Sequence, residues 1–151
     1  MPTGGRKDQT DEILLVEDNE NDIELAIRAL RKNDFTGEVH VVRDGVEAIE
    51  FMFGEGRRNG KSAPQLRVIL LDIKLPFIDG LEVLRRIKAE PRTRMIPVVV
   101  LTSSREERDI ETGYALGANS YVVKPVDFDQ YNEAIRKVGH YWMSLNRPPH
   151  K

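Results

Sequence analysis

Four short apolar runs recur along this chain, and each run ends on a residue with a polar side chain. The runs and the polar residues that follow them are 13–16 with Glu17 and Asp18, 68–71 with Asp72, 98–101 with Thr102, and 121–123 with Lys124. Runs of this kind predict strands that are buried on both faces of a parallel sheet. Because ligands bind outside the carboxyl ends of the strands in such sheets, three carboxylates, a hydroxyl and an ammonium are expected to meet at one edge.

The segments between these runs have the spacing of amphipathic helices. Ile23, Ala26, Ile27 and Leu30 follow an i, i+3, i+4, i+7 pattern, which predicts a helix with one face on the core. A second strand is expected at 39–42, and further helices are expected near 46–52, 81–88, 106–116 and 128–142. The alternation of strands and helices predicts an α/β fold with a parallel sheet.

Sequences that resemble capping boxes stand where strand-to-helix turns are expected. They are Asn21-x-x-Glu24, Asp44-x-x-Glu47, Asp79-x-x-Glu82, Ser104-x-x-Glu107 and Asp127-x-x-Gln130. One such match is weak, but a series of them at the expected turns supports the assignment of helices.

Composition narrows the class of protein. The chain has 151 residues, a net charge of −2 and no cysteine. The charge leaves no basic surface for nucleic acid or for a membrane, and no segment has the ~20 apolar residues that would span a bilayer.

We expect a flexible N-terminal arm at 1–11, one domain at 12–145, a tail at 146–151 and a cytoplasmic location. The irregular stretch 54–65 is interpreted as an exposed insertion or as a loop that contacts a partner.

The polar residues at the strand ends suit phosphoryl transfer. Mg²⁺ prefers carboxylate oxygens, which Glu17, Asp18 and Asp72 supply. With the metal bound, Asp72 would be the nucleophile that accepts a phosphoryl group as an acyl phosphate. Lys124 would pair with one phosphoryl oxygen, and Thr102 would donate a hydrogen bond to another.

Four motifs in this order resemble the receiver domain of two-component response regulators. They are LLVEDN at 14–19, LLDIKLPFIDG at 70–80, VLTS at 100–103 and GANSYVVKP at 117–125. The resemblance extends from about Glu12 to about Trp142 and implies a flavodoxin-like, doubly wound sheet of five parallel strands in the order 2-1-3-4-5, with five helices.

The resemblance also implies a role for each site residue. Asp72 matches the phosphoacceptor, and Glu17 and Asp18 match the acids that bind the metal. The backbone carbonyl of Lys74 matches a third metal ligand of the protein. The remaining matches are Thr102 with the switch hydroxyl, Tyr121 with the aromatic residue that changes rotamer on activation, Lys124 with the phosphoryl-binding lysine, and the Lys124–Pro125 peptide with one that is commonly cis.

A narrower resemblance connects the chain to stand-alone receivers that partner phytochrome-type histidine kinases. It rests on the EDNxxD motif at 17–22, DGVEA at 44–48, the long loop after 53–54, YALGANSY at 114–121 and the aromatic pair at 141–142. The implied function is a signalling protein, and not an enzyme on a separate substrate, that accepts a phosphoryl group from a sensor histidine kinase and then changes partners. The alternatives are a metal-dependent phosphohydrolase that works through an aspartyl phosphate and a binding module that is never phosphorylated. Lys74 argues against the hydrolase, because it stands where that class would need a second carboxylate.

Two further expectations concern lifetime and assembly. Lys74 and Ser104 lie two residues after the acceptor and two after the switch threonine. If Lys74 shields the phosphoryl group, self-dephosphorylation is slow and Lys74→Asn speeds it; the alternative is a lysine that points into solvent.

The aromatic residues Tyr141 and Trp142 lie at the end of an apolar stripe that begins with Phe128 and are expected beyond the cover of the sheet. They predict a two-fold homodimer through the fourth helix, fifth strand and fifth helix.

Overall fold

The computed structural model describes residues 12–54, 66–125 and 127–147, and its centre is a parallel sheet in the order β2-β1-β3-β4-β5. The strands are β1 (Glu12–Val16), β2 (Glu38–Val42), β3 (Val68–Leu71), β4 (Val98–Thr102) and β5 (Ser120–Val123). Val16 lies opposite both Val42 and Leu71, so neighbouring strands end at the same level. The predicted flavodoxin-like fold and its strand order are confirmed.

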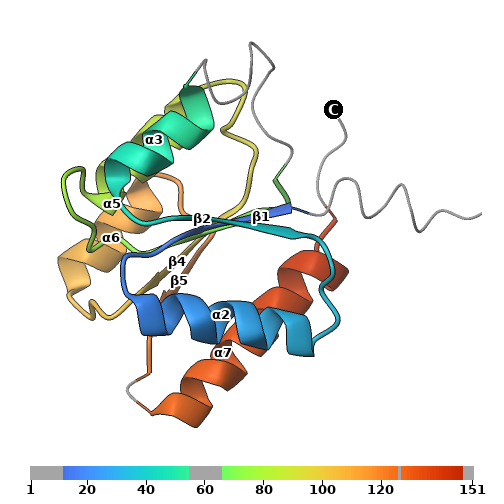
Figure 1. Ribbon diagram of the computed structural model, residues 1–151. Coiled ribbons are helices and arrows are strands. Elements are labelled where there is room, and N and C mark those ends of the chain that lie inside the picture. The colour runs from blue at the N-terminus through green and yellow to red at the C-terminus, as the bar shows by residue number, and fades with distance from the viewer. Residues whose placement is uncertain (1–11, 55–65, 126, 148–151) are drawn as a thin grey trace, which may run out of the picture.

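Helices cover both faces of the sheet (Figure 1). One layer holds α2 (Glu20–Lys32) and α7 (Phe128–His140), and the other holds α3 (Gly45–Phe53), α5 (Gly80–Ala89) and α6 (Glu107–Ala115). Alternate residues of each central strand point to opposite layers. In β1, for example, Ile13 and Leu15 pack in the α2–α7 layer, whereas Leu14 and Val16 pack in the core on the other side. This is why the central strands are apolar throughout.

Three of the predicted helix caps are confirmed. Asp44, Asp79 and Asp127 stand before α3, α5 and α7, and each carboxylate accepts a backbone hydrogen bond from the first turn. The other two predictions are wrong. Asn19 caps α2 through its side-chain oxygen, because the helix begins two residues before the predicted start, and Glu106 precedes α6 without a side-chain cap bond.

The end of α7 differs from the prediction. The helix stops at His140 and continues as a π-helical turn, η1 (Tyr141–Leu145). This turn directs Trp142 into the core beside α2, so that the side chain is buried, whereas Tyr141 is 46% exposed and meets the indole edge-on at 4.9 Å between ring centroids. The expectation that Trp142 lies beyond the cover of the sheet is therefore wrong. Phe128, where the apolar stripe begins, is 50% exposed.

A cis peptide bond between Lys124 and Pro125 is also not observed. All peptide bonds of the described residues are trans, the isomer that proline itself favours modestly. The predicted arm at 1–11 and the stretch 55–65 lie outside the described residues, as does most of the predicted tail. None of the described helices is long and apolar enough to cross a lipid bilayer.

Candidate functional site

Three acidic side chains meet at the carboxyl edge of the sheet, as the sequence predicts. Glu17, Asp18 and Asp72 each offer a carboxylate oxygen, and these oxygens lie within 4.8 Å of one another. Glu17 and Asp72 are buried, whereas Asp18 is exposed. In Figure 1, β1 runs from the right into the start of α2, so the left side of that view is the edge that holds the acids.

The sheet itself sets the position of the buried acids. The backbone N–H of Glu17 donates to the carbonyl of Val42 at 3.0 Å, and that of Asp72 donates to the carbonyl of Val16 at 3.0 Å. Each acid therefore extends the hydrogen bonding between neighbouring strands by one residue beyond the end of its own strand. A further constraint comes from Gly80, where a Cβ atom would lie 2.5 Å from the carbonyl oxygen of Asp72. The loop after Asp72 can pack this closely only because residue 80 has no side chain.

Lys124 lies at the centre of the acid cluster. Its Nζ atom is 2.7 Å from Oε1 of Glu17, 2.8 Å from Oδ2 of Asp22 and 3.2 Å from Oδ2 of Asp72. The side chain is 11% exposed. The backbone N–H of Lys124 donates to the carbonyl of Thr102 at 2.7 Å, which holds the lysine at the end of β5. One ammonium thus partly neutralises several carboxylates.

The pKa values of Glu17 and Lys124 reflect this crowding. Burial raises the pKa of Glu17 to about 7; the hydrogen bond from Lys124 opposes the shift and the charge of Asp72 adds to it. For Lys124, burial acts to lower the pKa, but the hydrogen bonds to Asp22 and Glu17 outweigh it and leave the pKa above its ordinary value. The lysine is therefore charged, and the site carries an excess of negative charge once Glu17 is ionised.

The sequence reasoning did not assign Asp22 to the site. This residue lies in the first turn of α2, four residues after Asp18, and its backbone carbonyl accepts a hydrogen bond from the hydroxyl of Tyr131 at 3.3 Å. Asp18 precedes the N-cap Asn19, so a helical spacing between Asp18 and Asp22 gave no signal for the site. The contact with Lys124, which is 102 residues away in the chain, had no local signal.

Thr102 and Tyr121 lie on neighbouring strands: Thr102 is the last residue of β4, and Tyr121 lies opposite Val100 within β5. Thr102 is completely buried, and its Oγ1 accepts a hydrogen bond of 3.4 Å from the backbone N–H of Ser104. The hydroxyl of Tyr121 donates to the carbonyl of Ser104 at 3.1 Å. Both predicted switch residues therefore contact the same residue of the loop between β4 and α6.

Lys74 is held at both ends. Its backbone N–H donates to Oδ1 of Asp72 at 3.0 Å, and its Nζ lies 3.5 Å from Oδ2 of Asp109 in α6. The side chain is 59% exposed, so most of it faces solvent while its end pairs with Asp109. The assignment of its backbone carbonyl as a metal ligand stays a prediction.

The residues present fit a divalent cation with a phosphoryl group beside it. Three carboxylates are the oxygen donors that Mg²⁺ and related hard cations prefer. Buried carboxylates this close repel one another, and a cation relieves that repulsion. Lys124 supplies a charge 3.2 Å from Asp72, and Thr102 supplies a hydroxyl at the end of the neighbouring strand, which suits an anionic group of several oxygens.

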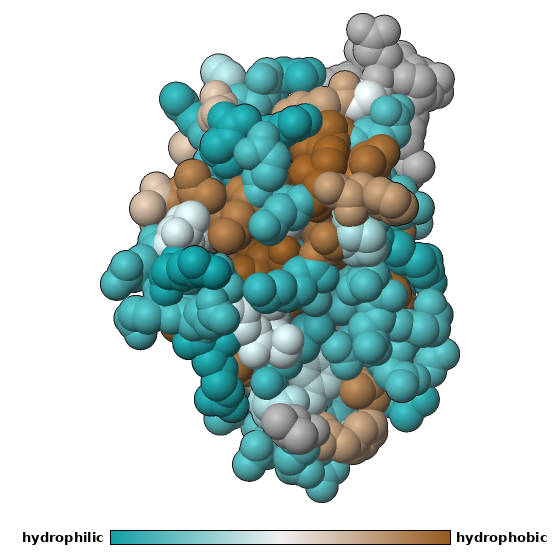
Figure 2. Space-filling model, turned by 90° about the vertical axis from the view of Figure 1, so that its left-hand side faces the viewer, coloured by the Kyte–Doolittle hydropathy of each residue, from teal (hydrophilic) through white to brown (hydrophobic). Residues whose placement is uncertain are grey.

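Apolar side chains adjoin the acid cluster. Figure 2 shows the edge formed by the carboxyl ends of the strands, where hydrophobic side chains gather in the upper half and hydrophilic ones cover most of the lower half. Phe77, in the loop that follows Asp72, is 85% exposed, and Val46 in α3 is 52% exposed. Phe77 also has a φ of +69°, which is rare for a residue with a side chain.

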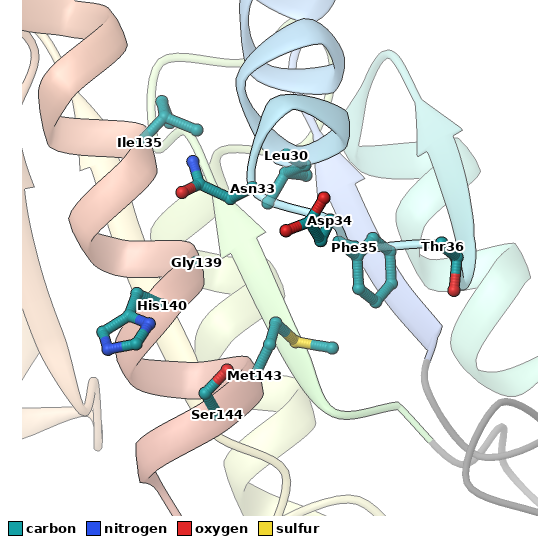
Figure 3. Close-up of a pocket in the computed structure, with 10 residues that line it drawn as sticks. All are labelled: Leu30, Asn33, Asp34, Phe35, Thr36, Ile135, Gly139, His140, Met143 and Ser144. Carbon is teal, nitrogen blue, oxygen red and sulfur yellow. The ribbon is translucent and has the colours of Figure 1, made fainter. Parts of the chain in front are cut away.

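A pocket of about 300 Å³ lies elsewhere, at the C-terminal end of α2 (Figure 3). Leu30, Phe35, Ile135 and Met143 give it apolar walls, and His140 lies at its edge on α7. The acid cluster is at the opposite, N-terminal end of α2. The pocket is therefore separate from the predicted site.

Comparison with known proteins agrees with this geometry. The model of the response regulator receiver domain family matches residues 13–136. A probable methanogenesis regulatory protein, FilR2 of Methanothrix harundinacea, is 42% identical over 138 residues, which are 91% of this chain and 86% of that protein. Response regulator Rcp1 of Synechocystis is 37% identical over 131 residues, which are 87% of this chain and 88% of that protein.

Solved structures are equally similar. The phosphorylated cyanobacterial phytochrome response regulator RcpA has a TM-score of 0.85 at 40% identity, and the alignment covers 92% of this chain and 98% of that one. The Mn²⁺-bound form of Rcp1 has a TM-score of 0.85 at 34% identity, with 92% and 99% covered. The fold, the acid cluster at the strand ends and these similarities lead to one conclusion: the chain belongs to the response regulator receiver domain family and is a phosphoacceptor signalling protein.

Proposed function

We propose that Asp72 accepts a phosphoryl group from a sensor histidine kinase, in a site where Glu17, Asp18, Asp72 and the backbone carbonyl of Lys74 hold Mg²⁺. The observation that carries the proposal is the meeting of three carboxylates within 4.8 Å, with Lys124 3.2 Å from Asp72. A buried aspartate that contacts the ammonium of Lys124 and adjoins two further acids has the surroundings that an acyl-phosphate acceptor needs.

The transfer itself requires little covalent chemistry from the protein. A carboxylate oxygen of Asp72 bonds to phosphorus while the bond from phosphorus to the histidine nitrogen of the donor breaks. Bound Mg²⁺ would neutralise charge on the transferring group. Lys124 then pairs with one phosphoryl oxygen, and the hydroxyl of Thr102, which is buried beside the site, donates to another.

The change of partners follows from the move of Thr102. When its hydroxyl turns to the phosphoryl group, the N–H of Ser104 loses its acceptor. Tyr121 is bonded to the carbonyl of the same residue and shifts with the loop. We infer that the face formed by α6, β5 and α7 changes shape in this way, as in other switches that a local charge biases.

This same face is our candidate for a homodimer. Tyr141 and Phe128 expose large aromatic surfaces on α7 and the turn that follows it, and exposed aromatic residues often supply the energy of an interface. A two-fold dimer would use each contact twice. Trp142 supports this surface from within, because its ring packs against Tyr141.

The named relatives suggest the kind of kinase. The similar solved structures include a cyanobacterial phytochrome response regulator and two bacteriophytochrome response regulators, and we propose a phytochrome-type histidine kinase as the donor. Such a kinase takes its phosphoryl group from ATP, so we place the reaction in the cytoplasm. We also propose that the protein has no separate substrate and catalyses only its own phosphorylation and dephosphorylation.

A mass measurement tests the acceptor. The protein is incubated with Mg²⁺ and phosphoramidate, and its intact mass is followed. The expected result is the addition of one phosphoryl group to the native protein and to Asp79→Asn, a matched change at an exposed helix cap, but not to Asp72→Asn. An adduct of equal yield on Asp72→Asn would overturn the assignment. Steady turnover of small phosphate esters would favour the phosphohydrolase instead.

A further inference from the structure

Asp109 connects the two loops that border the acceptor. Its Oδ2 accepts a hydrogen bond of 2.5 Å from the hydroxyl of Ser104 and lies 3.5 Å from Nζ of Lys74. The carboxylate side chain is 14% exposed.

The backbone of both partners touches the site. The N–H of Lys74 donates to Asp72, and the N–H of Ser104 donates to Thr102. The side chain of Lys74 therefore starts beside the acceptor and ends on α6, on the side of the switch threonine. It spans the gap between the loop after β3 and the loop after β4, at the surface of the molecule.

We propose that Asp109 is a positioning residue that sets the lifetime of the phosphorylated state, by anchoring the side chain of Lys74 across the entrance to Asp72. Hydrolysis ends that state: a water oxygen bonds to phosphorus, the bond from phosphorus to the Asp72 oxygen breaks, and inorganic phosphate leaves as the carboxylate is restored. The water donates its proton to the departing phosphate or to solvent. The aliphatic part of the Lys74 side chain, lying across the entrance to Asp72, obstructs the approach of this water.

Ser104 determines the direction of the anchor. Its hydroxyl donates to Asp109 and accepts a hydrogen bond of 3.4 Å from the N–H of Glu106, so it is not available to orient a water molecule towards Asp72. The bond to Asp109 fixes the carboxylate on the side that faces Lys74. Loss of either charge of the Lys74–Asp109 pair should therefore release the aliphatic part of the Lys74 side chain and expose the phosphoryl group. The expectation that Lys74→Asn speeds dephosphorylation follows from the same geometry.

The inference rests on the proposed function, and its test separates the two. Each variant is phosphorylated with phosphoramidate and Mg²⁺, the donor is removed by rapid desalting, and the phosphorylated fraction is followed by intact mass. Absence of an adduct on the native protein would contradict the proposed function. An adduct that forms normally but decays without regard to Asp109 would contradict only the inference.

Five variants make the test specific. Asp109→Asn and Lys74→Met are each expected to speed decay about threefold, and the double variant should decay no faster than the faster single one, because both changes break one interaction. Asp109→Glu should restore most of the native lifetime. Glu107→Gln, which removes an exposed charge from the same turn of α6, should leave the lifetime unchanged.

Two results would overturn the inference. One is a native lifetime in Asp109→Asn, and the other is a double variant whose acceleration is the product of the two single effects. Lys74→Met keeps the test valid if Asp109→Asn folds poorly, because Lys74 is exposed and its replacement leaves the core untouched. A purely structural role for Asp109 would lower the melting temperature without making the lifetime depend on Lys74.

Discussion

The ammonium of Lys124 lies 2.7 Å from the carboxylate of Glu17, and the two side chains are 11% and 2% exposed. This ion pair is closer than the one between Lys124 and Asp72, at 3.2 Å. Lys124 therefore has a structural role before any phosphoryl group is bound. It supplies positive charge to acids that would otherwise repel one another in a largely buried site.

Removal of this charge should destabilise the protein in the absence of metal. In EDTA, Lys124→Met is expected to lower the free energy of unfolding by about 3 kcal/mol, since it leaves the buried carboxylates of Glu17 and Asp72 without a positively charged partner. Added Mg²⁺ should recover part of the loss. Urea unfolding measures both effects, with Lys137→Met, an exposed lysine of α7, as the control. Equal stability of the two variants in EDTA would contradict this account.

Asp18 should behave in the opposite way. It is exposed, and it has no hydrogen bond or ion pair with the described part of the chain. We expect Asp18→Ala to keep or raise the melting temperature in EDTA, because one repulsive charge is lost, while the increase on adding Mg²⁺ becomes smaller than in the native protein. Glu111→Ala, at an exposed position of α6, is the control. A clear decrease of the melting temperature in EDTA would mean that Asp18 is structural.

The backbone at Phe77 should contribute measurable strain. Its φ of +69° costs a residue with a Cβ atom about 1–2 kcal/mol relative to ordinary backbone. Phe77→Gly is expected to be more stable than Phe77→Ala by about 1 kcal/mol in urea unfolding, because both lack the ring but only glycine relieves the strain. An alanine variant as stable as the glycine variant would show that the loop relaxes.

The acid stability of the protein should depend on Glu82. Hydrogen bonds from Arg85 and then Arg86 lower the pKa of Glu82 from 4.5 to about 2 in the folded protein. The unfolded chain therefore binds more protons in this window, and the stability from Glu82 is complete above pH 4.5 and is lost as the pH falls through about 2. Glu82→Gln should flatten the decline of stability between these values, whereas Glu24→Gln, an exposed change in α2, should leave its slope as in the native protein.

The two aromatic residues after α7 should give different results in a test of assembly. Tyr141→Ala is expected to weaken the homodimer at a small cost in monomer stability, because Tyr141 is half-exposed and its ring meets Trp142 edge-on. Trp142→Ala removes a buried side chain and should cost about 3–5 kcal/mol of folding stability. Light scattering across a concentration series measures the first effect, with Met95→Ala as an exposed apolar control. A monomer at every micromolar concentration, with and without a phosphoryl mimic, would rule out the dimer.

Most of the site could be predicted because the sheet determines it. When parallel strands end at one level, the residues that follow them must meet, and Glu17, Asp72 and Thr102 each needed only a strand to be recognised. The position of Lys124 was predicted by the same rule, because this residue follows the apolar run of β5. The order of the strands came from the resemblance to the family, since the apolar runs alone do not specify which strand is central.

The remaining contacts depend on side chains that are far apart in sequence. Asp109 belongs to a helix whose N-cap was wrongly assigned to Ser104. The Ser104 hydroxyl donates to that aspartate and accepts a hydrogen bond of 3.4 Å from the N–H of Glu106, the residue that precedes α6. The burial of Trp142 depends on a π-helical turn, for which the regular apolar spacing gives no sign. In both cases a local pattern was outweighed by a tertiary contact.

The position of Trp142 also gives the protein a built-in optical probe. It is the sole tryptophan of the chain, and it is buried in the layer formed by α2 and α7. Its fluorescence emission should be blue-shifted in the native state and should move to longer wavelength when that layer opens. Because the indole lies towards the C-terminal end of α7, whereas the acid cluster lies beyond the N-terminal end of α2, the signal reports unfolding of this layer separately from chemistry at Asp72.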